Sequence, residues 1–194
     1  MEEIKIRTGG PPDREAMLAM YRDFEPLGAA LGLPPFTESG RQSWIDRLLN
    51  EAFHWLAVRN GERVVGHTIL ADSGPGEAEI AFFVYQSFRG RRIATLLVVA
   101  ALAAARERGY RRIWATVCAD NVPALKLLRA RGFERSRISA PTMELELLLR
   151  QPLPATPVAV TTRSGVTPPH SSRTARPSEQ SRAVGLNQPQ AAGV

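Results

Sequence analysis

The stretch that most restricts the fold is an uncharged run at residues 94–105, ATLLVVAALAAA, in which Thr95 is the one polar residue. Residues 94–108 are predicted to form a helix that is apolar on nearly all sides, and such a helix is buried deeply or packed on a sheet. The run is shorter than the roughly 18 apolar residues that span a membrane. It also lies too far from the N-terminus for a signal peptide. We therefore expect a buried helix here, with other elements packed around it.

Strand and helix patterns alternate on both sides of this run. Strands are expected at 4–7, 54–60, 63–70, 77–85, 111–118 and 141–149, and helices at 11–24, 37–50, 94–108 and 121–133. Asn60-Gly61 and the sequence SGPG at 73–76 are turn signals, so the three strands between residues 54 and 85 should be antiparallel neighbours. The order β-α-α-β-β-β-α-β-α-β predicts a single α/β domain, with a mixed, mainly antiparallel central sheet and helices on both faces.

The composition changes sharply at Arg150. Residues 151–194 contain seven prolines, many Ser, Thr, Gln and Ala residues, and no aromatic residue. Such a segment cannot bury enough apolar surface to offset the entropy lost on ordering. We predict that residues 1–150 form the folded domain and that residues 151–194 are a disordered tail. The tail could bind a partner or could be a solvated appendage.

The charge and cysteine content narrow the possible partners. A net charge of +6 favours anionic partners, but four arginines and one glutamate place half of it in residues 151–194. The folded part is only mildly basic. A nucleic-acid-binding protein that uses the tail is a further alternative, but the near-absence of stacking aromatic residues in basic context argues against it, and no nucleic-acid partner is expected. The single Cys118 cannot form an internal disulfide, which is compatible with a cytoplasmic location. No zinc-ligand spacing is present.

The loop YQSFRGRRIA at residues 85–94 joins the strongest predicted strand to the apolar helix. Free backbone N–H groups and the positive end of the helix dipole suit a phosphate at such a position. Gly90 allows close approach of the backbone, and Arg89, Arg91 and Arg92 add positive charge. The loop lacks the Lys-Ser/Thr pair of a Walker motif and the three glycines of a dinucleotide fingerprint. It is interpreted as a pyrophosphate cradle, with a basic surface turn as the alternative.

Together with its neighbours, the loop resembles the GNAT acetyltransferase superfamily over residues 4–148. Arg89-Gly90-Arg91-Arg92-Ile93-Ala94 is similar to that family's pattern Arg/Gln-x-x-Gly-x-Gly/Ala, with Arg92 in place of the middle glycine. A second family signature is matched by Asn121, Ala124, Gly132 and Phe133. Leu128 stands where many members carry tyrosine. The two motifs occur in the family's order on a matching string of strands and helices.

The resemblance implies acetyl-CoA as the donor and a primary amine as the acceptor. The CoA pyrophosphate would bind the N–H groups of residues 91–94, and the pantetheine arm would follow strand residues 80–84. This strand and residues 112–118 would diverge to form the acetyl slot. The implied cofactor-binding residues are Phe83, Val84, Arg89, Gly90, Arg91, Arg92, Ile93, Ala94, Thr95 and Asn121. A positive φ at Arg92 would be strained, whereas in a near-helical backbone arginine would fit without penalty. We expect the near-helical backbone, because the cradle needs only backbone atoms.

Direct transfer to an amine requires a general base. Glu79 is predicted to be this base, because it lies in the strand beside the slot; Glu77, on the same strand face, is the alternative, and an exposed charge is the other interpretation of Glu79. A backbone N–H near Val84 could polarise the acetyl carbonyl. Leu128 cannot donate a proton, so another group or water must protonate the leaving thiolate, or it departs without help.

The remaining reactive residues are interpreted as structural. His54 and His67 are expected to be packed or surface histidines within strands. Cys118 is expected to be a buried thiol, because no neighbour that would lower its pKa is evident.

These expectations combine into a prediction of an acyl-CoA-dependent N-acetyltransferase of the cytoplasm. Its partners would be acetyl-CoA and an unidentified amine, with no metal, membrane or nucleic acid, and a homodimer is possible. A catalytically weak acyl-CoA-binding regulatory module is the alternative, since the loop glycine at Arg92 and the tyrosine at Leu128 are both missing.

Overall fold

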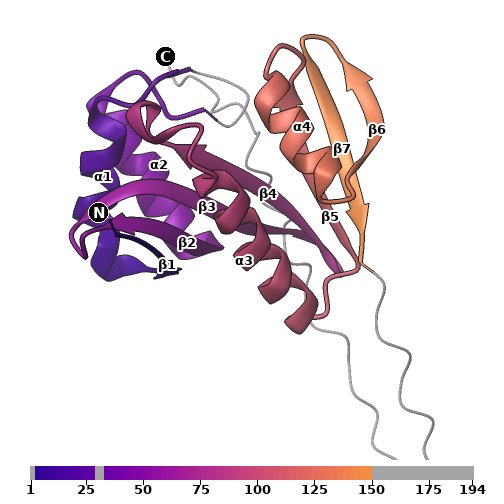
Figure 1. Ribbon diagram of the computed structural model, residues 1–194, viewed down its shortest axis with the longest axis horizontal. Helices are drawn as coiled ribbons and strands as arrows, with labels where there is room; N and C mark the ends of the chain where they lie inside the picture. Colours follow the sequence, from indigo (N-terminus) through magenta and orange to yellow (C-terminus); the bar gives the residue numbers. More distant parts are fainter. Residues whose placement is uncertain (1–2, 29–32, 150–194) are drawn as a thin grey trace, which may run out of the picture.

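The computed structural model describes residues 3–28 and 33–149. Their strands form one seven-stranded sheet in the order β1-β2-β3-β4-β5-β7-β6 (Figure 1). The strands are β1 (Ile4–Gly9), β2 (Ala52–Arg59), β3 (Arg63–Gly74), β4 (Glu77–Val84), β5 (Arg112–Cys118), β6 (Glu134–Ser139) and β7 (Thr142–Leu148). Neighbouring strands are antiparallel except β4 and β5, which are parallel. The predicted tail, 151–194, lies outside the described residues.

Helices cover both faces of this sheet. They are α1 (Arg14–Arg22), α2 (Glu38–Glu51), α3 (Ile93–Glu107) and α4 (Val122–Ala130), with short 3-10 helices at Pro11–Asp13 and Gln86–Phe88. Side chains of α1 and α2 pack in one core and those of α3 and α4 in the other. The predicted mixed, mainly antiparallel sheet with helices on both faces is therefore confirmed.

One strand was not predicted. Strand β6 follows α4 and pairs with β7 at the edge of the sheet. All six of its residues are exposed, so its sequence, ERSRIS, has no alternation of apolar and polar residues from which a strand could be recognised.

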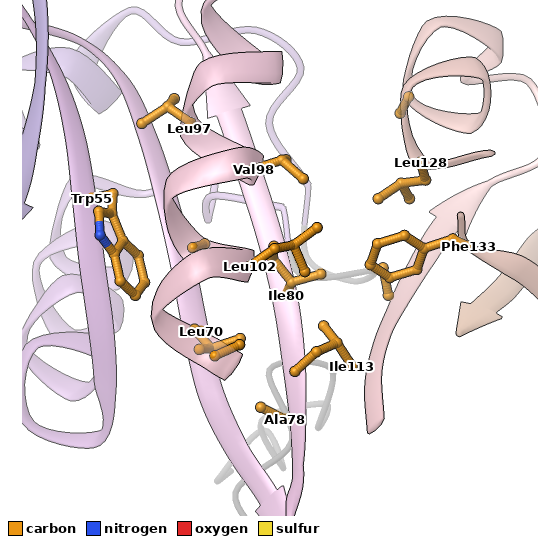
Figure 2. Packing of buried hydrophobic residues seen from close by; sticks show 14 of the residues in the cluster. Trp55, Leu70, Ala78, Ile80, Leu97, Val98, Leu102, Ile113, Leu128 and Phe133 are labelled. Atoms are coloured by element: carbon orange, nitrogen blue, oxygen red, sulfur yellow. The ribbon is translucent and has the colours of Figure 1, made fainter. Parts of the chain in front are cut away.

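The apolar run packs as a helix on the sheet, as predicted. Its buried side chains include Leu97, Val98 and Leu102. In Figure 2 Val98 and Leu102 point toward Leu128 and Phe133, whereas Leu97 lies on the other side of the helix. The opposite side of α3 is open: Leu96 and Val99 are 51% and 44% exposed. Residues of β4 alternate between the two cores, with Ala78 and Ile80 toward α3 and Phe83 toward α1 and α2.

A buried chain of hydrogen bonds connects the sheet to α1 and α2. His54 Nε2 donates to Leu48 O (2.9 Å), His54 Nδ1 lies 2.9 Å from His67 Nε2, and His67 Nδ1 lies 2.7 Å from the Tyr21 hydroxyl. Because a carbonyl oxygen only accepts, His54 carries its proton on Nε2, and its Nδ1 accepts from His67 Nε2. His67 Nδ1 then accepts from the Tyr21 hydroxyl. These directions hold for neutral rings, in which each imidazole has one donor nitrogen and one acceptor nitrogen.

The surroundings of these hydrogen-bonded side chains favour their neutral forms. Burial lowers the pKa of His54, and burial together with the neighbouring His54 lowers the pKa of His67 well below its ordinary value. Burial also raises the pKa of Tyr21. The expectation of packed histidines is confirmed, since both side chains lie in the core.

We expect acid to destabilise the fold below pH 6.5, the ordinary histidine pKa. Below this pH the unfolded chain binds protons that the folded chain excludes. The free energy of unfolding should then fall by up to about 1.4 kcal/mol per pH unit for each histidine that stays neutral. Above it, the stabilisation is complete. Urea unfolding at about pH 7.5 and about pH 5.5 measures the difference, and His67→Leu should reduce the slope. Equal stability of the unmodified chain at both pH values would contradict this.

Candidate active site

The sheet opens between its two parallel strands. Strands β4 and β5 pair over three positions, Glu77 with Arg112, Ala78 with Ile113 and Glu79 with Trp114. Both strands continue further, to Val84 and Cys118, and Figure 1 shows them diverging. Beyond these three pairs, the facing edges of β4 and β5 are no longer paired with each other, as predicted for these two strands.

The backbone of β4 directs alternate groups toward this opening. Tyr85 N donates to Val65 O (3.0 Å), and Val84 lies opposite Gly66 in β3. Since successive residues of an antiparallel strand bond to opposite sides, Val84 and Phe82 turn their N–H groups away from β3 and toward β5. The Val84 carbonyl accepts from Arg89 Nε (3.0 Å). The N–H groups of Phe82 and Val84 are thus donors that β4 offers at the opening, and that of Val84 lies nearest to the loop.

Phe83 lies differently from what was predicted. Its backbone faces β3 opposite His67. Its ring packs edge-on against Tyr21, Phe24 and Trp44, with centroid distances of 5.7, 5.9 and 5.8 Å. Phe83 thus packs beneath α1 and α2, and the neighbouring N–H that turns away from β3 belongs to Val84.

The loop before α3 contains two left-handed residues. Gly90 has φ 75°, and Arg92, the N-cap of α3, has φ 61° and ψ 9°. The expectation of a near-helical Arg92 is wrong: the chain needs the left-handed turn that glycine makes easily, and an L-residue there costs roughly 1–2 kcal/mol. A Cβ added at Gly90 would meet no atom within 4 Å, so positive φ is what favours glycine there. The loop leads directly into the free N–H groups of the first turn of α3.

The arginines of the loop have separate roles. Arg89 donates to Val84 O and to Glu25 O, and its guanidinium lies 5.6 Å from the centre of the Phe24 ring. Its side chain thus fastens the end of β4 to the segment after α1, a role that sequence reasoning missed. The Arg91 guanidinium stacks 4.9 Å from the centre of the Phe88 ring, and the Arg92 side chain is exposed.

Asn121 forms the N-cap of α4. Its side-chain oxygen accepts from Ala124 N (3.2 Å), a hydrogen bond that stabilises the start of the helix. Because the oxygen is used by the cap, the side-chain NH2 is the group that Asn121 can offer to a ligand.

Glu79 lies where the strands part. It forms the last pair with β5, opposite Trp114, and is 3% exposed on the strand face toward α1 and α2. Its predicted alternative, Glu77, accepts from Arg112 Nη1 (2.9 Å), and the same guanidinium binds Glu144 and Glu146. Sequence reasoning did not identify this network, although alternation along 112–118 would have placed Arg112 and Trp114 on one face.

The remaining predicted residues are buried or unreactive. Leu128 is fully buried and, with Phe133, faces Val98 and Leu102 of α3 across the core (Figure 2). Burial raises the pKa of the Cys118 thiol, and the nearby Asp120 carboxylate raises it further. Cys118 is half-buried and its thiol is protonated at neutral pH, which agrees with its structural interpretation.

Residues 3–28 and 33–149 contain neither a candidate metal site nor a candidate membrane-spanning helix. No group of three or more His, Cys, Asp or Glu side chains in this part could hold a metal ion. No helix described here is long and apolar enough to cross a membrane.

Comparison with known proteins gives consistent matches. A model of the acetyltransferase (GNAT) family matches residues 14–133. A mycothiol acetyltransferase from Saccharomonospora viridis is 28% identical over 153 residues, which are 69% of this chain and 46% of that protein. The chain therefore spans about half the length of this relative.

Solved structures match the fold. An N-acetyltransferase from Staphylococcus aureus Mu50 superposes with a TM-score of 0.63 and 24% identity, over 76% of this chain and 99% of that one. A GNAT superfamily phosphinothricin acetyltransferase from Sinorhizobium meliloti, in complex with acetyl-CoA, gives a TM-score of 0.62 and 16% identity, over 75% and 88%. At these identities the matches support the fold alone.

The left-handed conformation of Arg92 leads to a prediction about the stability of the fold. Arg92→Gly should raise the free energy of unfolding by about 0.5–1 kcal/mol, because relief of the left-handed strain exceeds the entropic cost of glycine. Arg91→Gly is the matched control, since Arg91 is not among the residues with positive φ, and it should not stabilise. Urea unfolding measures both variants. An Arg92→Gly protein less stable than the unmodified chain would show that this position carries no strain.

Proposed function

The chain belongs to the acetyltransferase (GNAT) family, and from this we propose that it transfers the acetyl group of acetyl-CoA directly to a primary amine. The observation that carries the proposal is the divergence of β4 and β5 after three pairs. It leaves the edge of β4 open beside the glycine-containing loop at the start of α3. Acetyl-CoA needs such an arrangement, because its extended pantetheine arm is joined to a pyrophosphate.

The residues present fit acetyl-CoA. Val84 offers a backbone N–H on the free edge of β4, so an amide-containing arm can bind there as an added strand would. The N–H groups of residues 91–94 form the start of α3, where the helix dipole favours phosphate. Gly90 and Arg92 turn the chain so that this helix start faces the end of β4, and Arg91 adds a charge. The side-chain NH2 of Asn121 can contact the arm.

The acceptor is placed on the face of the sheet that carries Glu79. Beside Glu79, the network around Arg112 contains three carboxylates, of Glu77, Glu144 and Glu146, against one guanidinium. Such an excess of negative charge attracts an ammonium group. This supports the proposal of a cationic amine as acceptor, bound on the same face as the proposed base.

The chemistry requires little from the protein. The acceptor ammonium must lose one proton before its nitrogen can form a bond to the acetyl carbon, and Glu79 accepts that proton, directly or through water. The nitrogen loses a second proton as the amide forms, and this proton passes to water or to the departing thiolate. The Val84 N–H polarises the acetyl oxygen. The carbon–sulfur bond then breaks, and the thiolate leaves. Because Leu128 is buried and cannot donate a proton, the thiolate departs without a side-chain acid at this position or is protonated by water.

A second candidate is a regulatory module that binds acyl-CoA with weak catalysis. It is favoured by the absence of a proton donor at Leu128 and by the strained residue at the start of α3. Both candidates require binding of acetyl-CoA, and turnover distinguishes them.

Turnover is tested on the full chain. We expect acetyl-CoA to raise the melting temperature, and we expect free CoA to be released when polyamines, aminoglycosides, amino acids or lysine peptides are offered. A raised melting temperature without CoA release on any acceptor would favour the regulatory module. No thermal shift at millimolar acetyl-CoA would contradict both candidates.

The assignment of the base is tested with the most active acceptor. Glu79→Gln keeps the shape of the side chain and removes its basicity, so kcat should fall by roughly 100-fold or more. Glu77→Gln tests the alternative, because Glu77 is on the same strand face. A large loss in Glu77→Gln with kcat retained in Glu79→Gln would reverse the assignment. Melting of each variant separates loss of the base from loss of the fold.

A further inference from the structure

The helix that follows the loop, α3, packs tightly against Gly66 in β3. A Cβ added to Gly66 would lie 2.9 Å from Leu97 Cδ1, 3.1 Å from Ile93 Cγ2 and 3.2 Å from Ala57 Cβ. The first two atoms belong to α3 above, and the third to β2 alongside. Ile93 and Leu97 are almost completely buried in the core beneath α3. Glycine in a strand marks such a close approach.

Gly66 also lies next to the other half of the proposed CoA site. It is opposite Val84 in the ladder between β3 and β4. Ile93, which packs over it, is the first residue of α3 and directly follows the N-cap, Arg92. Gly66, which has no side chain, thus lies beside Val84, the residue whose N–H is the proposed donor of β4, and beneath the first turn of α3.

We infer that Gly66 is a positioning residue for CoA binding, because it sets the height of the first turn of α3 above β4. This inference rests on the proposed function. A single ligand spans both groups of donors, with its arm at Val84 and its pyrophosphate at residues 91–94. The two groups must therefore be held at the separation that the ligand fixes, and small displacements of such groups weaken binding strongly. A side chain at Gly66 would lift the start of α3 and change that separation.

Gly9 in β1 provides a control, because a side chain added there would be similarly crowded but on another strand. A Cβ added to Gly9 in β1 would lie 2.8 Å from Leu56 Cγ and 2.9 Å from Leu56 Cδ1. Leu56 belongs to the core beneath α1 and α2, and β1 is separated from β4 by two strands. Gly9→Ala should therefore disturb packing without moving the start of α3.

The experiment measures the Kd of CoA by calorimetry, and urea unfolding, for full-length variants. Gly66→Ala should weaken CoA binding by roughly tenfold or more, which corresponds to about 1.4 kcal/mol. Gly9→Ala should bind as the unmodified chain does, although it also loses stability. Leu97→Val in the Gly66→Ala background removes a clashing Cδ atom and should restore most of the affinity.

Three results would overturn the inference. The first is a Gly66→Ala variant that is folded and binds CoA as the unmodified chain does. The second is equal weakening by Gly66→Ala and Gly9→Ala, which would reduce Gly66 to a packing role. The third is an affinity that Leu97→Val does not restore although stability recovers. Failure of the unmodified chain itself to bind CoA would instead contradict the proposed function.

Discussion

The whole arrangement depends on the early end of the parallel ladder between β4 and β5. Parallel strands buried on both faces normally pair along their length, but here pairing stops after Glu79 and Trp114. The strands can part because apolar side chains occupy the space between them on the α3 side. Figure 2 shows Ile80, Val98 and Leu102 facing Leu128 and Phe133 across this space. These packed apolar side chains hold the two parts of the sheet together, while the edges of β4 and β5 remain apart.

The same divergence explains why the proposed donors lie on different elements yet act on one ligand. β4 ends beside the opening, and the loop turns through Gly90 and Arg92 so that α3 begins close to that end. Arg89 fastens the turn by bonding to the carbonyl of Val84. Close contact of Ile93 and Leu97 with Gly66 then fixes the helix above the sheet. A strained residue is tolerated at Arg92 because this packing determines the path of the chain on both sides of it.

Much of the fold could be predicted from the sequence because its elements have clear periodicity and turn signals. Asn60 and Gly61 both have positive φ, as their turn requires, and the apolar run packs as a helix. β6 could not be predicted, since an exposed edge strand has no buried face to impose alternation. The φ of Arg92 was predicted wrongly because it is set by the path between β4 and α3 rather than by local preference. Likewise, the bonds of Arg89, His54 and His67 arise from strand register and from partners distant in sequence.

Amide hydrogen exchange in β4, resolved by residue with and without CoA, tests the account most directly. The N–H groups of Phe82 and Val84 turn toward the opening, whereas Phe83 belongs to the ladder with β3. CoA bound along the open edge should slow exchange at Val84, with a smaller effect at Phe82, and at residues 91–94, while Phe83 changes little because it is already bonded. Protection confined to Phe83, or no protection in β4 at saturating CoA, would contradict the assignment of the open strand edge as the binding site.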